Sequence, residues 1–325
     1  MVVLSTILGR YASTASKRIR HEVLFEEHLD RYVDSVKGAR IRYRYREAKS
    51  QPAKKVFALL AGWTCSPAAF IPIIPALNAE NDIITMENRG HWRSALGTSS
   101  VDSYLSDLAH DLKAVMDEEG VKKAVLVAHS MWGISAVKFY HAFRDQVEAI
   151  VFICPALSSP LELWSFGNSV SVELAIKALL SFLEYNPITN FATHALAGNR
   201  IAIASIKRIA SMADLAKNGH DDDLAFSRFM QQVLATDKKT RALALRAMLR
   251  ESADGLMLDQ VDVPVMLITG ELDWLIVHDK VLPLARIMPH CEHVVRLPGV
   301  AHVPPLEAPI ETASLIREFT RSALQ

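Results

Sequence analysis

Short, largely apolar segments constrain the fold of this chain more than any other feature of its sequence. They are Val56 to Leu60, Asp82 to Met86, Ala124 to Ala128, Ala149 to Cys154 and Val265 to Thr269. Continuous apolar runs of this length are typical of strands buried on both faces, because a half-buried strand would alternate apolar and polar residues. Segments with a helical period, such as 102–119 and 131–143, lie between them. This alternation predicts an α/β fold with a mostly parallel, doubly wound sheet covered by helices on both faces.

Further elements extend the predicted core at both ends. Residues 31–36 and 39–46 are expected to form an antiparallel hairpin that turns at Lys37-Gly38. In its second arm Ile41, Tyr43 and Tyr45 alternate with arginines, so we expect one buried face and an arginine face in solvent, rather than a phosphate-binding patch. A last strand over 293–297 and a closing helix over 307–323 complete the core.

The alternation stops between about residues 157 and 258, where the pattern is mostly helical. We interpret this stretch as a helical cap inserted over the carboxyl edge of the sheet, where open α/β sheets bind ligands. The predicted organisation is an N-terminal arm over 1–22, a first core part over 23–156, the cap over 157–258 and a second core part over 259–325.

Composition excludes several classes of function. Lys plus Arg number 36 and Asp plus Glu number 36, so no net charge favours nucleic acid as a partner. The three cysteines are too few and too scattered for a disulfide framework or a zinc site, which predicts reduced thiols in the cytoplasm. No apolar run is long enough to span a bilayer.

The first 21 residues contain four Lys or Arg residues and no acidic one. A cleaved secretory signal is disfavoured, since no charge precedes the apolar stretch. We expect a terminal arm that packs on the protein or on another subunit, with an organelle-targeting or peripheral membrane helix as the alternative.

Three polar residues follow three of the predicted strands. Ser130, Asp273 and His302 come after the segments at 124–128, 265–269 and 293–297, so parallel strands would bring them to one edge of the sheet. Each alone has an ordinary structural explanation, but together they predict a catalytic triad. His302 would take the proton that makes Ser130 a nucleophile, and Asp273 would hold the imidazole in the required tautomer.

An anion formed during such a reaction needs hydrogen-bond donors. The turn that exposes Ser130 points the next backbone N–H, that of Met131, toward the same place. We expect the second donor in the loop after the 56–60 segment, with the Trp63 N–H as the candidate.

At these positions the chain resembles the α/β-hydrolase superfamily. The elbow at Ser130 lies within residues 128–133, and residues 87–94 are similar to the family's Asp-x-Arg-Gly-x-Gly-x-Ser loop. Residues 264–273 resemble its acid-bearing strand, and residues 300–309 resemble its histidine loop. The resemblance implies a serine hydrolase that cleaves carboxylic esters, with no metal and no organic cofactor. It does not define the substrate, since this fold supports many chemistries.

The chain departs from the family pattern at several glycines. The elbow is usually Gly-x-Ser-x-Gly, and Ala128 and Trp132 stand at its two glycine positions, while Trp92 replaces another glycine. These tryptophans either fill core space or narrow an aromatic acyl pocket. For Trp132 we predict the pocket, and we expect Trp63, Trp132 and Trp164 to contact a small hydrophobic ester, thioester or lactone.

Two other functions are compatible with this fold. Cofactor-free dioxygenases resemble the chain at Gly62-Trp63, but those relatives carry their acid after the strand that follows the elbow helix. Here residues 154–158 contain no acid, so Asp273 favours hydrolysis. A ligand receptor without turnover is the second alternative, because Trp132 could distort the elbow. Ser130 argues against epoxide hydrolases and haloalkane dehalogenases, which carry an aspartate at that position.

Overall fold

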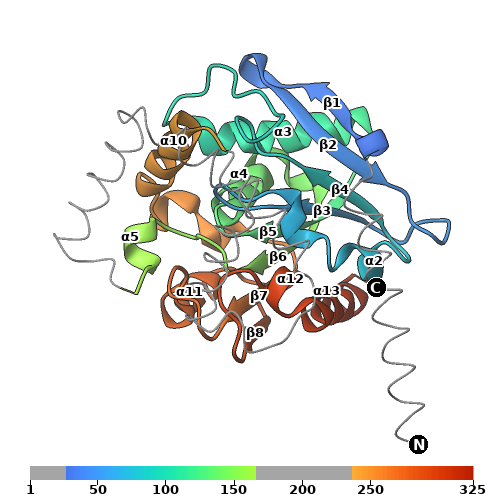
Figure 1. Ribbon diagram of the computed structural model, residues 1–325. Coiled ribbons are helices and arrows are strands. Elements are labelled where there is room, and N and C mark those ends of the chain that lie inside the picture. Colours follow the sequence, from blue (N-terminus) through green and yellow to red (C-terminus); the bar gives the residue numbers. More distant parts are fainter. Residues whose placement is uncertain (1–26, 166–235, 325) are drawn as a thin grey trace, which may run out of the picture.

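A computed structural model describes residues 27–165 and 236–324, and this part of the chain contains one eight-stranded sheet (Figure 1). The strand order is β1-β2-β4-β3-β5-β6-β7-β8. β1 and β2 form the predicted antiparallel hairpin, β2 also pairs antiparallel with β4, and the remaining pairs are parallel. The strands are β1 (Arg31–Asp34), β2 (Arg40–Arg46), β3 (Val56–Leu60), β4 (Asp82–Met86), β5 (Ala124–His129), β6 (Val147–Ile153), β7 (Val265–Gly270) and β8 (His293–Leu297).

Helices cover both faces of the sheet, which confirms the predicted α/β fold. α3 and α4 pack side by side over one face, and α2 and α13 pack together over the other (Figure 1). The described helices are α2 (Ile74–Leu77), α3 (Tyr104–Glu118), α4 (Trp132–Phe143), α5 (Pro160–Leu163), α10 (Lys238–Leu249), α11 (His278–Ala285), α12 (Pro304–Glu307) and α13 (Pro309–Ala323). None of them is long and apolar enough to cross a membrane.

The centre of the sheet is apolar on both faces because its strands lie between these two helical layers. Every residue of β5 is buried, as are the last four of β3 and the last five of β6. Burying one large aliphatic side chain stabilises the folded state by roughly 1.5–3 kcal/mol, so these three strands contribute strongly to the stability of the sheet. Their carboxyl ends all point to the edge at which Ser130 and Asp273 leave the sheet.

The prediction of a solvated arginine face on β2 is wrong for Arg42 and Arg46, each of which is only 8% exposed. Arg42 donates to Asp30 over 2.6 Å and also bonds to Glu87. Asp30 precedes β1 and Glu87 follows β4, the two neighbours of β2 in the sheet. The chain therefore supplies carboxylates to this face, and pairing lets an arginine be buried.

The predicted cap and arm are described only in part. Residues 157–165 and 236–258 contain the short helix α5 and the longer helix α10, which contact each other, and no strand. The predicted helix over 172–183 and the arm over 1–22 lie outside the described residues. The boundaries of the cap remain a prediction.

Candidate active site

Ser130 lies on the turn between β5 and α4, in a backbone conformation that L-residues rarely adopt. Its φ is 54°, which is in the left-handed region. Hydrogen bonds hold the turn, because the Ser130 N–H donates to Ile153 O over 3.1 Å and the Ser130 carbonyl accepts from Gly133 N and Ala156 N, each over 2.8 Å. The partly exposed hydroxyl thus stands above the end of the sheet.

The structure brings Ser130, His302 and Asp273 into one hydrogen-bonded chain. His302 Nε2 lies 3.0 Å from Ser130 Oγ, and His302 Nδ1 lies 2.8 Å from Asp273 Oδ2. The other carboxylate oxygen of Asp273 accepts from the N–H groups of Leu275 and Ile276, each over 2.9 Å. With Nδ1 donating to the carboxylate, Nε2 is left as an acceptor for the serine proton.

Burial and charge act in opposite directions on this pair. Burial raises the pKa of Asp273, but the charge of His302 and the hydrogen bonds that the carboxylate accepts outweigh it, and its pKa is lowered below the usual range. Burial lowers the pKa of His302, but the charge and hydrogen bond of Asp273 leave it above 6.5. Asp273 is therefore an anion whose charge stabilises a protonated His302.

The half-buried Glu307 and the buried His129 hold the backbone on either side of His302, and neither role was predicted from the sequence. The Glu307 carboxylate accepts from Ala301 N over 2.6 Å and from Val303 N over 2.7 Å. His129 Nε2 lies 2.8 Å from the His302 carbonyl and donates to it. Glu307 lies within residues 300–309, which resemble the family's histidine loop, and its carboxylate contacts backbone only four and six residues away. The role of His129 has no local sequence signal, because His302 lies 173 residues further along the chain.

The loop after β3 passes directly beside the nucleophile. A Cβ at Gly62 would lie 2.6 Å from Ser130 Cβ, so only glycine allows this approach. The next N–H, that of Trp63, is the predicted oxyanion donor. The other, that of Met131, belongs to the N-cap residue of α4, where the first N–H groups have no acceptor within the helix. The structure thus brings both loops to Ser130.

A cavity of about 240 Å³ opens at Ser130 and His302. Its described lining is mainly apolar and comes from the loop after β3, α5, α10 and the loop after β7: Trp63, Pro160, Trp164, Leu245, Met248, Leu275 and Ile276. The Trp63 indole donates to the Arg241 carbonyl over 3.0 Å, which ties the loop after β3 to α10. Two of the three predicted substrate-contacting tryptophans, Trp63 and Trp164, therefore line the cavity.

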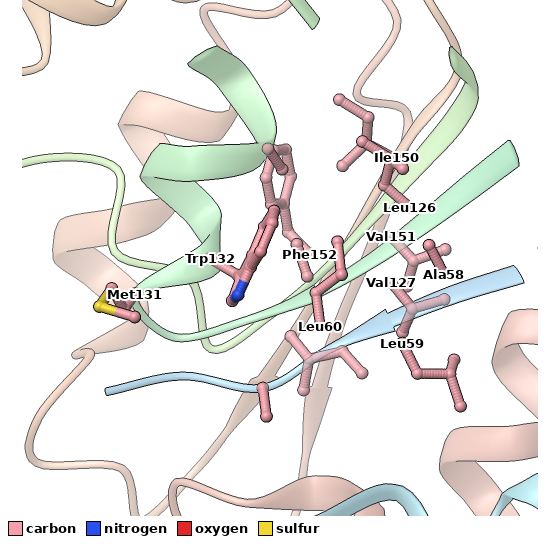
Figure 2. Close-up of a cluster of buried hydrophobic side chains, with 14 of the residues drawn as sticks. Ala58, Leu59, Leu60, Leu126, Val127, Met131, Trp132, Ile150, Val151 and Phe152 are labelled. Carbon is pink, nitrogen blue, oxygen red and sulfur yellow. The ribbon is translucent and has the colours of Figure 1, made fainter. Parts of the chain in front are cut away.

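The prediction that Trp132 lines this pocket is wrong. Its side chain is fully buried and points from the start of α4 into the apolar layer between helix and sheet, near Leu60 and Phe152 (Figure 2). Ser130 lies on the turn before α4, and Trp132 is the first residue of that helix, where its side chain faces the sheet rather than the cavity. Trp92 also lies away from the cavity lining; it has a φ of 47° and is 39% exposed.

Cys154 lies next to Asp273, directly after β6. Its Sγ and the ligand atoms of Asp273 and His302 lie within 4.8 Å of one another. Burial raises the pKa of this thiol well above its usual value. In this buried position the thiol is therefore expected to be protonated.

Comparison with known proteins agrees with the fold. Residues 55–309 match the family model described as alpha/beta hydrolase fold, so the chain belongs to this family.

Several solved structures share the fold. Esterase RhEst1 from Rhodococcus sp. ECU1013 is 22% identical, with a TM-score of 0.70, over 91% of this chain and 99% of its own. The enol-lactonase from Burkholderia xenovorans LB400 is 17% identical, with a TM-score of 0.68, over 90% of this chain and 100% of its own. The epoxide hydrolase CorEH is 20% identical, with a TM-score of 0.65, over 90% of this chain and 98% of its own. At these identities the likeness concerns the fold.

Proposed function

We propose that this α/β-hydrolase is a serine hydrolase that cleaves a carboxylic ester, thioester or lactone with an apolar acyl group. The observation that carries the proposal is the chain of hydrogen bonds from Ser130 through His302 to Asp273, with distances of 3.0 and 2.8 Å. Similarity to proteins named as esterases and an enol-lactonase supports the same class of reaction.

The reaction proceeds in two halves. His302 Nε2 takes the proton of Ser130 as Oγ attacks the carbonyl carbon, and the N–H groups of Trp63 and Met131 donate to the resulting oxyanion. The imidazolium, stabilised by Asp273, protonates the leaving group, and an acyl-enzyme remains. Water then gives a proton to His302 and attacks the acyl carbon, which releases the acid and restores Ser130.

The cavity supports an apolar acyl group as the specificity element. Its described walls offer aliphatic side chains and the rings of Trp63 and Trp164, with no charged side chain other than His302 when that ring is protonated. A charged acyl group would lose its hydration there without a compensating partner. We propose that Trp63 and Trp164 contact the acyl chain.

The alternatives are less well supported by the site. The hypothesis of a cofactor-free dioxygenase expects the acid directly after β6, but the residue there is Cys154. The acid that binds the histidine is Asp273, after β7. The hypothesis of a ligand receptor without turnover depends on an elbow that Trp132 distorts. Trp132 is instead buried in the core, and Ser130 has the left-handed turn conformation and the hydrogen bond to His302 that catalysis needs.

We propose a cytoplasmic setting for the reaction. All three cysteines are unpaired, which supports a reducing, cytoplasmic compartment. We propose a small hydrophobic ester-type substrate as the partner, no nucleic acid, and an arm over residues 1–21 that contacts a subunit or a membrane surface.

The nucleophile is tested by covalent labelling. We expect a fluorophosphonate to label the protein at Ser130 alone, and Ser130→Ala to lower ester turnover by roughly 10⁴ to 10⁶-fold. The measurements are mass spectrometry of the labelled peptide and initial rates on a series of p-nitrophenyl esters of increasing acyl length. Ser106→Ala, a serine of α3 outside the cavity, is the control. A Ser130→Ala protein that still labels and turns over normally would exclude the serine mechanism.

A further inference from the structure

The peptide bond between Gly62 and Trp63 links two groups with different tasks: the Gly62 carbonyl accepts hydrogen bonds from the protein, and the Trp63 N–H is the proposed oxyanion donor. The carbonyl of Gly62 and the N–H of Trp63 belong to the same planar group, and in a trans peptide they point in opposite directions. Whatever fixes the direction of the Gly62 carbonyl therefore also fixes the direction of the Trp63 N–H. Gly62 lies against Ser130, so this N–H is next to the nucleophile.

The Asn88 side chain is bound to this peptide unit. Its Nδ2 donates to the Ala61 carbonyl over 2.9 Å and to the Gly62 carbonyl over 3.2 Å, and the Gly62 carbonyl also accepts from the Cys65 N–H over 3.1 Å. Asn88 follows β4, which pairs with β3, so its amide reaches across to the loop that leaves β3. Asn88 is only 1% exposed, and water has little access to compete for these bonds.

Trp132 holds Asn88 in the required orientation. Its indole Nε1 donates to Asn88 Oδ1 over 2.7 Å. An indole N–H can only donate and backbone carbonyls can only accept, so the Asn88 amide has one orientation that satisfies all its partners. The fully buried tryptophan and the buried asparagine thus form a continuous chain of hydrogen bonds from α4 to the loop after β3.

We infer that Trp132 and Asn88 are positioning residues that aim the Trp63 N–H at the oxyanion formed on Ser130. The inference rests on the proposed function and adds to it two residues that do not touch substrate. Trp132 is the first residue of α4, two residues after Ser130 on the preceding turn, so the second oxyanion donor is held from the segment that directly follows the nucleophile. This gives a physical role to the largest departure of the elbow from the family's Gly-x-Ser-x-Gly pattern.

We call the hydrogen bonds from Trp132 through Asn88 to the Gly62 carbonyl the relay. Four variants test it: Asn88→Asp, Asn88→Ala, Trp132→Phe and the double variant Trp132→Phe/Asn88→Ala. Asn88→Asp keeps an acceptor for the indole but places an oxygen against two carbonyl oxygens, and we expect kcat on a short p-nitrophenyl ester to fall about 10 to 100-fold with KM within about threefold. This is less than the about 10² to 10³-fold that loss of an oxyanion donor costs, because the N–H is misaimed rather than removed. Trp132→Phe keeps the aromatic shape and should lower kcat about 3 to 10-fold.

The double variant should be no slower than Asn88→Ala alone, because Trp132 acts through Asn88. The second readout is inhibition by an alkyl trifluoromethyl ketone. Ser130 Oγ bonds to its carbonyl carbon, the serine proton passes to His302, and the ketone oxygen becomes an alkoxide in the oxyanion hole. We expect its inhibition constant to rise in proportion to the loss of kcat/KM in each variant.

Phe139→Leu is the control for destabilisation alone, since Phe139 is a fully buried aromatic on the same helix, outside the cavity lining. It should lower the denaturant midpoint and leave kcat and inhibitor affinity unchanged. If the Asn88 variants behave like Phe139→Leu, or if the losses in the double variant multiply, the relay is wrong. Both outcomes differ from failure of the proposed function, in which the parent protein is neither labelled at Ser130 nor active on esters.

Discussion

At the scale of single residues, His302 is subject to two opposing influences on its charge. Burial favours the neutral ring, whereas the carboxylate of Asp273 favours the imidazolium, and the balance raises the pKa of His302 above 6.5. A higher pKa makes the ring a better proton acceptor, but it also keeps the ring protonated up to a higher pH. The base needed for the first step is therefore fully available only above this raised pKa.

The pH dependence of ester hydrolysis tests this balance. We expect kcat/KM to fall as pH falls, with the acid limb above pH 6.5. Asp273→Asn removes the charge that raises the pKa, so the limb should move to lower pH, while the remaining activity drops by about 10⁴-fold through the wrong tautomer. The measurement is kcat/KM against pH for both proteins. A parent limb below pH 6.5, or a limb that does not move in the variant, contradicts the assignment.

At the scale of elements, the end of β7 packs directly against the loop that carries His302. The backbone bonds from Glu271 N to Leu297 O and from Leu272 N to Val300 O measure 2.9 and 2.8 Å. Gly270 leaves no space between the two, because a Cβ there would lie 2.0 Å from the Ala301 carbonyl oxygen. The separation of Asp273 and His302 is therefore determined by contact between two pieces of backbone.

Gly270→Ala should disturb catalysis through this contact. The added methyl group must displace the histidine loop, and we expect kcat to fall about 10 to 100-fold, since a shift of about 1 Å at a reacting group can cost 10²-fold. Overpacking should also lower the free energy of unfolding by about 1–3 kcal/mol. The measurements are ester kinetics and urea denaturation. Gly255→Ala, where the added Cβ would meet only the Ser252 hydroxyl at 3.2 Å, is the matched control. Equal activity in both variants would argue against a direct contact.

At the scale of the whole molecule, the described part of the chain contains two fully buried histidines that carry no charge, His91 and His129. Burial lowers the pKa of His129 to about 3 and that of His91 to about 4. In the unfolded chain both would bind a proton near pH 6.5. Between about pH 6.5 and these lowered values, the unfolded state therefore binds more protons than the folded state, and stability falls as pH falls. His302, with its raised pKa, acts in the opposite direction.

Acid sensitivity should thus appear before the carboxylates titrate. We expect the free energy of unfolding to decrease between pH 6.5 and 5 by up to about 1.4 kcal/mol per pH unit for each of the two histidines. His91→Gln and His129→Gln should each flatten this dependence. The measurement is urea denaturation at several pH values, with the exposed His28→Gln as the surface control. If the free energy of unfolding depends on pH equally in the parent protein and in both buried-site variants, the two histidines are not the cause of the acid sensitivity.

Much of the fold could be predicted because the apolar pattern of each segment matches the burial of that segment in the folded protein. β3, β4 and β8 have the predicted bounds, β5 and β7 each end one residue later, and β6 begins two residues earlier and ends one residue earlier than predicted. Continuous apolar runs have one stable location in a parallel sheet, between two layers of helices. The convergence of Ser130, Asp273 and His302 could be predicted for the same reason, since each follows a strand and parallel strands end at one edge.

The direction in which side chains point at the ends of those strands depended on the tertiary structure. Arg42 is buried because the segments beside β2 bring the carboxylates of Asp30 and Glu87 to it, which a two-residue alternation does not reveal. Trp132 packs into the core because the start of α4 turns it toward the sheet, although its position next to Ser130 predicted a pocket. Asn88 had no sequence signal, because its three partners come from two other segments of the chain. Strand periodicity and residue order are properties of the chain alone, whereas a buried polar group obtains its partners, and with them its role, only from the folded contacts around it.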